Sequence, residues 1–334
     1  MGSPTGIQVK VKEGRNTMKI VITDCSWGSY DIEKQYLPQD AEVVCKQILT
    51  EDEVIETCQG AVAALSEYAP YTRRVLEALP DLKIISNSAM GVDNIDLDAA
   101  KELGVTVANV PDYCFDEVAE HAMALILSTL RNIPGYNEKV RREKKWDFAD
   151  APKLYRINGM TLGLIGCGRI PRKAAVMAKG FGLKLVGYDP YLPQEVADEY
   201  GITMMSIEEL AEVSDIILSH VPLMPSTAKM VGKNLFDHVK KQPIFVNTSR
   251  GGTVDHDALC DALESGAVRA AALDVVDEEP ANFNSRIFQY DNVIFTPHAA
   301  FYSETALEEV RRRSAENVTH FLAGEGKVEY VVKP

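Results

Sequence analysis

The segment Leu162-Gly-Leu-Ile-Gly166-Cys-Gly168-Arg-Ile-Pro171 decides the fold. An apolar run typical of a buried strand is followed by G-x-G-x-x, the turn that joins a strand to a helix in a dinucleotide-binding unit. In the full motif a third glycine permits close packing of the helix on the strand. Here Pro171 takes that position. Because proline is tolerated in the first turn of a helix, the helix is expected to form with altered packing.

An acid lies about 20 residues beyond this loop, where a dinucleotide fold places the carboxylate that binds the ribose. The next strand-like run, 184–188, leads directly into Asp189. A carboxylate there accepts a hydrogen bond from the ribose 2′-hydroxyl and repels a 2′-phosphate. Asp189 therefore favours NAD over NADP. The competing interpretation is an ordinary turn or helix-cap aspartate.

Short β-branched runs alternate with helical patterns along the chain, which is typical of βαβ units and parallel sheets. The expected strands are 19–23, 61–65, 83–86 and 105–108 in a first series, and 162–165, 184–188, 215–219, 244–247, 270–273 and 293–295 in a second. We therefore predict an α/β protein with two doubly wound, Rossmann-like parallel-sheet domains.

Two helical patterns suggest how the domains are connected. The strongly apolar helix 118–130 separates the two series and is expected to be buried at an interface, and the last helix, 303–322, is expected to return to the first domain. This predicts a discontinuous substrate-binding domain, 18–117 with 300–334, and an NAD-binding domain, 118–299. Residues 1–17 carry no strand or helix pattern and are expected to be a disordered extension.

The composition disfavours several classes of protein. Hydrophobic residues make up 46% of the chain and charged residues 25%, the balance of a soluble globular protein. No apolar run approaches the ~20 residues that span a bilayer. A formal charge of -14 disfavours binding to nucleic acid or anionic lipid. The six cysteines contain no CxxC pair, so neither a metal site nor a disulfide framework is indicated and a cytoplasmic location is expected.

Three polar segments follow expected strands: 247–252, 273–280 and 296–300. The carboxyl ends of parallel strands are where such sheets bind ligands. Their candidate residues are Arg250, Glu279 and His298. Taken singly, each has a simpler interpretation, namely a surface arginine, a turn residue before a proline and a hydrogen-bonded loop histidine.

Together with the glycine loop, these segments resemble the D-isomer-specific 2-hydroxyacid dehydrogenases, from about Met18 to the C-terminus. The resemblance implies that Arg250 holds the substrate carboxylate, that Glu279 supports the histidine and that His298 is the acid-base. It also implies NAD as cofactor. The implied cofactor contacts are Gly166, Gly168, Arg169, Ile170, Asp189, His220, Val221, Pro222, Thr227, Thr248, Ser249, Asp274 and Ala300.

The chemistry of this trio has a physical basis of its own. Hydride transfer to a 2-oxo acid builds negative charge on the carbonyl oxygen, so a positioned acid must supply a proton. An imidazolium such as that of His298 suits this near neutral pH, and a carboxylate beside it raises the histidine pKa. A guanidinium pairs with a carboxylate through two parallel hydrogen bonds.

The resemblance also implies substrate contacts. Segment 87–94 resembles the family's carboxylate loop, with Met90 and Gly91 supplying backbone N–H groups, and Tyr68 and Phe301 are expected to line the substrate pocket. Ordinary loop packing is the alternative for Tyr68 and Met90. Within the family, the C-terminal-binding protein branch is the most similar and has tryptophan at the place of Phe301. An aromatic ring there favours an apolar or thioether substrate side chain.

Another difference concerns charge, because Asn87 stands where phosphoglycerate-specific relatives place an arginine. The absence of this arginine weakens the case for a phosphorylated substrate. The sequence therefore predicts an enzyme that reduces a small 2-oxo acid with NADH. A phosphoglycerate or hydroxypyruvate dehydrogenase and an NADH-sensing interaction module remain open as alternatives. A homodimer is expected through helix 118–130, with burial of that helix inside the monomer as the alternative.

Overall fold

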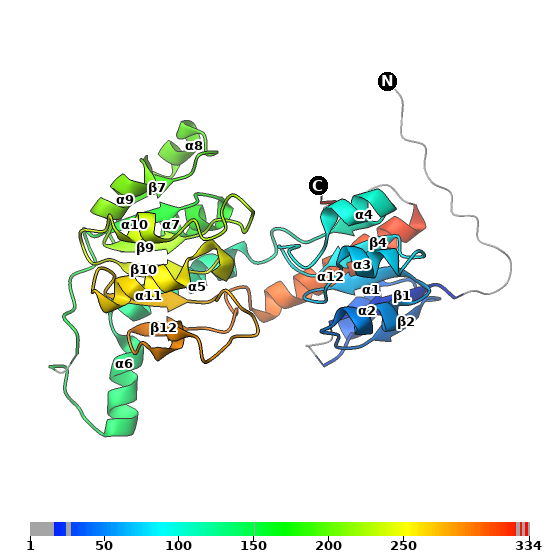
Figure 1. Ribbon diagram of the computed structural model, residues 1–334, viewed down its shortest axis with the longest axis horizontal. Helices are drawn as coiled ribbons and strands as arrows, with labels where there is room; N and C mark the ends of the chain where they lie inside the picture. Colours follow the sequence, from blue (N-terminus) through cyan, green and yellow to red (C-terminus); the bar gives the residue numbers. More distant parts are fainter. Residues whose placement is uncertain (1–16, 25–27, 150, 325–327, 329–330, 333–334) are drawn as a thin grey trace. The chain divides into compact units, whose positions relative to one another are not determined.

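The computed structural model describes residues 17–24, 28–149, 151–324, 328 and 331–332, so the expected extension lies outside them apart from Thr17. The chain forms two compact units, Met1–Tyr113 with Ser303–Pro334 (unit 1) and Cys114–Tyr302 (unit 2). In each unit, helices flank a parallel sheet (Figure 1).

The described part of unit 1 has a five-stranded sheet in the order β2-β1-β3-β4-β5. Its strands are β1 (Lys19–Ile22), β2 (Glu42–Cys45), β3 (Ala61–Ser66), β4 (Ile84–Asn87) and β5 (Thr106–Ala108). Its helices are α1 (Asp31–Tyr36), α2 (Glu51–Cys58), α3 (Arg73–Glu77), α4 (Leu97–Leu103) and α12 (Glu304–Ala323). The sequence prediction missed β2, an edge strand with no fully buried residue.

Helix α12 belongs to unit 1. Its Ala315 and Val318 pack in one apolar cluster with Ile20 of β1. Its Arg311 donates two hydrogen bonds to Glu33 of α1, from Nε to Oε1 at 2.6 Å and from Nη2 to Oε2 at 2.7 Å. Both side chains are buried, so this ion pair fixes the returning helix inside the unit.

The described part of unit 2 has a seven-stranded sheet in the order β12-β11-β10-β9-β6-β7-β8. Its strands are β6 (Thr161–Ile165), β7 (Lys184–Tyr188), β8 (Thr203–Met204), β9 (Ile216–Ser219), β10 (Ile244–Asn247), β11 (Ala270–Leu273) and β12 (Val293–Phe295). The order reverses between β6 and β9, and doubly wound sheets bind nucleotides at the carboxyl ends of strands at such a point. The two-residue strand β8 was not predicted.

The helices of unit 2 are α5 (Phe115–Leu130), α6 (Ile133–Glu138), α7 (Arg169–Gly180), α8 (Gln194–Glu199), α9 (Ile207–Val213), α10 (Lys233–Phe236) and α11 (His256–Glu264). One π-helical turn (Lys139–Glu143) follows α6, and 3-10 turns lie at Gly251–Thr253 and Arg286–Gln289. Local signals start several helices. Ser206, for example, forms a capping box with Glu209 at the beginning of α9.

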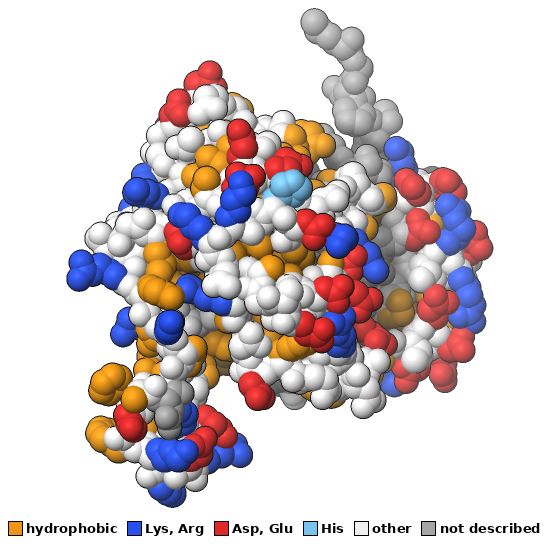
Figure 2. All heavy atoms as spheres, turned by 60° about the vertical axis from the view of Figure 1, so that its left-hand side comes forward, with side chains coloured by type: hydrophobic (Ala, Val, Ile, Leu, Met, Phe, Trp, Pro, Cys, Tyr) orange, Lys and Arg blue, Asp and Glu red, His pale blue; other side chains and the backbone are white. Residues whose placement is uncertain are grey.

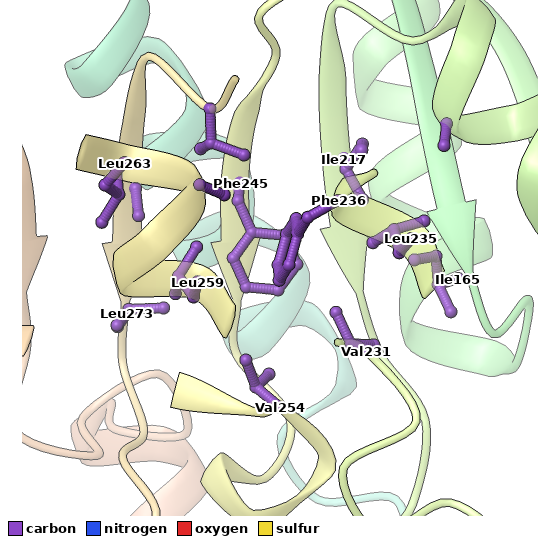
Figure 3. Packing of buried hydrophobic residues seen from close by; sticks show 14 of the residues in the cluster. Ile165, Ile217, Val231, Leu235, Phe236, Phe245, Val254, Leu259, Leu263 and Leu273 are labelled. Atoms are coloured by element: carbon purple, nitrogen blue, oxygen red, sulfur yellow. The ribbon is translucent and has the colours of Figure 1, made fainter. Parts of the chain in front are cut away.

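The core of unit 2 lies between the sheet and its helices. Phe245 of β10 meets Phe236 of α10 edge to face, with ring centroids 5.7 Å apart (Figure 3). On α5, seven residues are buried, and the helix packs on α7, β10 and β11 of the same unit. The apolar character of helix 118–130 is therefore explained by burial within the monomer, the alternative that the sequence left open.

After α5 the chain presents apolar side chains to solvent. Ile133, Val140, Trp146 and Phe148 are exposed, Trp146 by 90% and Phe148 by 81%. Figure 2 shows orange side chains among charged ones on the segment that extends from the body of unit 2 at the lower left. No helix among the described residues is both long and apolar enough to cross a membrane.

Candidate active site

The glycine loop of unit 2 has the shape that a phosphate-binding turn requires. Gly166 has a φ of +82°, and a Cβ built there would lie 2.6 Å from the carbonyl oxygen of His220, so only glycine fits. Gly168 is the N-cap of α7, which begins at Arg169 and contains the buried Pro171. Proline at the third motif position therefore does not prevent the helix, as predicted.

Buried polar atoms gather at the carboxyl ends of β9 and β10. Oγ of Ser219, Nε2 of His220 and Oγ1 of Thr248 are buried and have no hydrogen-bond partner in the described part of the chain. Burial lowers the pKa of His220 to about 4, and the charge of Arg250 acts in the same direction. Because unpaired buried polar groups are costly, this edge fits a polar ligand such as a dinucleotide.

Asp189 lies directly after β7, where its carboxylate organises the glycine loop. Oδ2 accepts a hydrogen bond from the N–H of Cys167 at 2.9 Å, and Oδ1 accepts one from the N–H of Tyr191 at 2.9 Å. Each carboxylate oxygen has two lone pairs, so both can accept a further hydrogen bond. The acid thus stands beside the loop and can also receive a ribose hydroxyl.

Other residues expected to contact the cofactor hold their own loops together. The hydroxyl of Ser249 donates to the carbonyl oxygen of Val221, which ties the loop after β10 to the loop after β9. The hydroxyl of Thr227 donates to the carbonyl oxygen of Pro222 at 2.5 Å. Of the remaining residues, Ile170 is buried and the guanidinium of Arg169 lies 5.6 Å from the ring centroid of Phe115.

The predicted acid-base pair is brought together by the loops that follow β11 and β12. Nδ1 of His298 lies 2.6 Å from Oε2 of Glu279, whose Oε1 accepts a hydrogen bond from the N–H of Val276 at 3.1 Å. Burial alone would raise the pKa of Glu279. The hydrogen bond and charge of His298, with smaller effects of Val276 and Arg250, outweigh burial and lower it. Glu279 is therefore an ionised carboxylate facing the imidazole at neutral pH.

Two more residues complete this region. The ring of Phe301 lies edge-on to that of His298, with centroids 6.3 Å apart. Arg250 is followed by Gly251, where a Cβ would lie 1.8 Å from the carbonyl oxygen of Val276. The Arg250 loop and the Glu279 loop are therefore in direct backbone contact, which only glycine permits.

Asp274, which was predicted to contact the cofactor, also holds the loop that carries His298, because its backbone and carboxylate oxygens accept hydrogen bonds from that loop. Its backbone oxygen accepts the N–H of His298 at 2.7 Å. Its carboxylate accepts the N–H groups of Ala299 at 2.9 Å and Ala300 at 3.0 Å. His298 itself has a φ of +50°, in the left-handed region that non-glycine residues seldom adopt.

The candidate substrate residues Tyr68, Met90 and Gly91 belong to unit 1. The carbonyl oxygen of Gly91 accepts a hydrogen bond from Nδ2 of Asn87 at 2.7 Å, and that of Met90 accepts one from Asn109 at 2.7 Å. Tyr68 is 51% exposed. The buried side chain of Asn87 thus supports the backbone of segment 87–94.

Two acids of unit 1, Asp24 and Glu67, were not predicted as site residues from the sequence. Asp24 follows β1 and Glu67 follows β3, the adjacent strands at which the order of this sheet reverses. Asp24 accepts the N–H groups of Glu67 at 2.8 Å and of Tyr68 at 3.1 Å. Burial, and then the charge of Asp24, raise the pKa of Glu67 to about 8. The signal that could have identified these two acids in the sequence is their position just after predicted strands.

Comparison with known proteins gives a consistent picture. Residues 123–300 match the family model described as the NAD binding domain of D-isomer specific 2-hydroxyacid dehydrogenases. The chain is 39% identical over 310 residues to a D-3-phosphoglycerate dehydrogenase of Methanocaldococcus jannaschii, covering 92% of this chain but only 58% of that relative. It is 36% identical to a glycerate dehydrogenase of Methylorubrum extorquens, covering 82% of this chain and 87% of the relative.

Among solved structures, a D-lactate dehydrogenase from Aquifex aeolicus, complexed with NAD and lactic acid, superimposes with a TM-score of 0.84. The two chains are 28% identical, and the match covers 94% of this chain and 99% of that one. The similarity to this structure therefore extends over both units of the chain.

Proposed function

The chain belongs to the D-isomer specific 2-hydroxyacid dehydrogenase family and carries its NAD-binding domain, and from this premise we propose that it reduces a small 2-oxo acid with NADH. The observation that carries the proposal is the 2.6 Å contact between His298 and the ionised Glu279. It lies at the carboxyl ends of β11 and β12, on the same edge of the sheet as the buried, unpaired polar atoms that follow β9 and β10 and fit a dinucleotide. Bound NADH supplies the hydride.

The residues of the chain supply the rest of the chemistry. Reduction places negative charge on the substrate's carbonyl oxygen, and a proton delivered there removes it. His298 delivers this proton from Nε2, because Glu279 occupies Nδ1 and holds the ring in one orientation. Arg250 pairs with the substrate carboxylate through two hydrogen bonds. The carboxylate of Asp189 accepts a hydrogen bond from the ribose 2′-hydroxyl.

The other predicted contacts are carried forward as proposals. For the cofactor these are the glycine loop and the segments 220–222, 227, 248–249, 274 and 300. For the substrate they are Tyr68, Met90, Gly91 and Phe301. In domain terms, we assign cofactor binding to 118–299 and substrate binding to 18–117 with 300–334.

We further propose that the substrate has an uncharged side chain. The ends of β1, β3 and β4 in unit 1 carry Asp24, Glu67 and Asn87 and no lysine or arginine. A phosphate or second carboxylate would meet the carboxylate of Asp24 there, beside the protonated Glu67, and no cation to neutralise it. This favours a simple 2-oxo acid over a phosphorylated one, in spite of the high identity with a phosphoglycerate dehydrogenase.

The test is a substrate panel followed at the nicotinamide absorbance band: pyruvate, hydroxypyruvate, 3-phosphohydroxypyruvate, phenylpyruvate and 4-methylthio-2-oxobutyrate. We expect turnover of an uncharged member and a loss of about a hundredfold or more in His298→Ala. The exposed His238 of the same unit gives a matched control, since His238→Ala should keep full activity. NADH binding without turnover of any of these 2-oxo acids would refute the proposed dehydrogenase activity and favour an NADH-sensing interaction module. Such a module would be identified by specific binding of a short peptide to unit 1.

We also propose a homodimer. Helix α5 no longer supports it, but the exposed apolar residues Ile133, Val140, Trp146 and Phe148 do, since patches of this kind mark protein contacts. Sedimentation should show a dimer that Trp146→Glu with Phe148→Glu dissociates, whereas Phe283→Glu, at a site also exposed, does not. A monomeric wild-type protein would contradict this. The six cysteines form no CxxC pair and no dense framework in the sequence, which supports the proposal of a cytoplasmic location.

A further inference from the structure

A row of three polar side chains connects helix α5 to the loop that carries His298. Nε2 of His121 on α5 lies 3.0 Å from Oγ1 of Thr296, the first residue after β12. The Thr296 hydroxyl donates to Oδ1 of Asp274, the first residue after β11, at 2.5 Å. Nε2 of His121 is itself 3.6 Å from that oxygen.

The direction of the hydrogen bonds follows from what each group can donate. A threonine hydroxyl has one proton, and here it is given to Asp274, so the hydroxyl oxygen can only accept from His121. His121 must therefore carry a proton on Nε2. The result is a donor chain that ends on a buried carboxylate, and hydrogen bonds in such a chain strengthen one another in a low dielectric.

The carboxylate at the end of this chain is the group that holds the histidine loop. Asp274 accepts the N–H groups of Ala299 and Ala300 on its side chain and that of His298 on its backbone. The φ of +50° at His298 is a strained backbone conformation that persists only where the surroundings enforce it. A rotation of the Asp274 carboxylate would release two of these three bonds.

We propose that His121 is a positioning residue for proton transfer: through Thr296 it fixes the Asp274 carboxylate, and thereby the backbone that aims the imidazole of His298. The inference rests on the proposed reduction of a 2-oxo acid. In this proposal helix α5 contributes to the position of His298 as well as to the packing of unit 2. It also explains why a polar, partly buried histidine stands on a helix whose other inward residues are apolar.

The kinetic test uses His121→Leu and its conservative counterpart His121→Gln, whose amide nitrogen can take the place of Nε2. We expect His121→Leu to lower kcat by about tenfold to a hundredfold with little change in KM, and His121→Gln to restore most of it. Thr296→Val should act like His121→Leu, and the double variant should be no worse than either, since both break one chain. His238→Leu is the matched control and should keep the wild-type kcat.

A long-range 1H–15N spectrum of histidine-labelled protein gives a readout that does not depend on turnover. His121 should show the Nε2–H tautomer, and His121→Leu should move the ring signals of His298, with those of His238 unchanged. A Nδ1–H tautomer, unmoved His298 signals or additive losses in the double variant would each overturn the inference. Turnover by the wild-type protein tests the proposed function separately, because the inference depends only on the ratio of variant to wild type and on these spectra.

Discussion

Glu67→Gln should stabilise unit 1 at neutral and alkaline pH, because the folded state keeps this buried carboxyl protonated. Its pKa rises from an ordinary 4.5 to about 8 in the folded protein, through burial and then the charge of Asp24. Below pH 4.5 the group is protonated in both states and costs nothing. As the pH rises from 4.5 to 8, the unfolded chain releases the proton and the folded chain does not, so the free energy of unfolding falls.

The magnitude follows from that window. Each pH unit above 4.5 costs about 1.4 kcal/mol, which amounts to about 3 kcal/mol at pH 7. Glutamine keeps the shape of the side chain and cannot ionise. The variant should therefore exceed the wild type in unfolding free energy by about this amount at pH 7 and match it near pH 4.5.

The assay is urea denaturation at several pH values, with hydrogen exchange of the β3 and β4 amides to report on unit 1 alone. Glu33 supplies the matched control, since it is also a buried glutamate of unit 1 but pairs with Arg311. Glu33→Gln should destabilise by about 3–5 kcal/mol, because it leaves a buried guanidinium without its carboxylate. Equal stability of Glu67→Gln and wild type at pH 8 would refute the reasoning.

Three further predictions concern unit 2. Glu279→Gln should lower kcat for reduction by about a hundredfold or more, because the carboxylate that holds the His298 imidazole in one orientation is lost; a wild-type kcat in this variant would argue against the pair. Asp189→Ala should weaken NADH binding by roughly tenfold to a hundredfold and narrow the preference over NADPH, as measured by fluorescence titration of both cofactors. Gly251→Ala should lower kcat/KM at least about tenfold, because its Cβ would lie 1.8 Å from the Val276 oxygen and displace the Glu279 loop; wild-type kinetics in this variant would contradict the backbone contact.

The inner strands could be predicted because each is a short apolar run bounded by turn residues, as in 244–247 and 270–273, which match β10 and β11 residue for residue. The edge strands β2 and β8 escaped detection, since an edge strand needs no buried face and β8 has only two residues. Helix α5 shows the converse limit. Its apolar pattern required burial, but a pattern does not say whether the covering surface comes from the same unit or from another copy.

The sequence by itself determined the class of the fold, the glycine loop, the acid at Asp189 and the residue types of the candidate catalytic trio, because each depends on local spacing or on position after a strand. Only the tertiary structure decided what those residues touch. The short contact between Glu279 and His298, the anchoring of residues 298–300 by Asp274 and the raised pKa of Glu67 beside Asp24 all join segments that are distant along the chain. Electrostatic and hydrogen-bond energies depend on distance and burial, and these exist only once the parallel strands have been placed side by side.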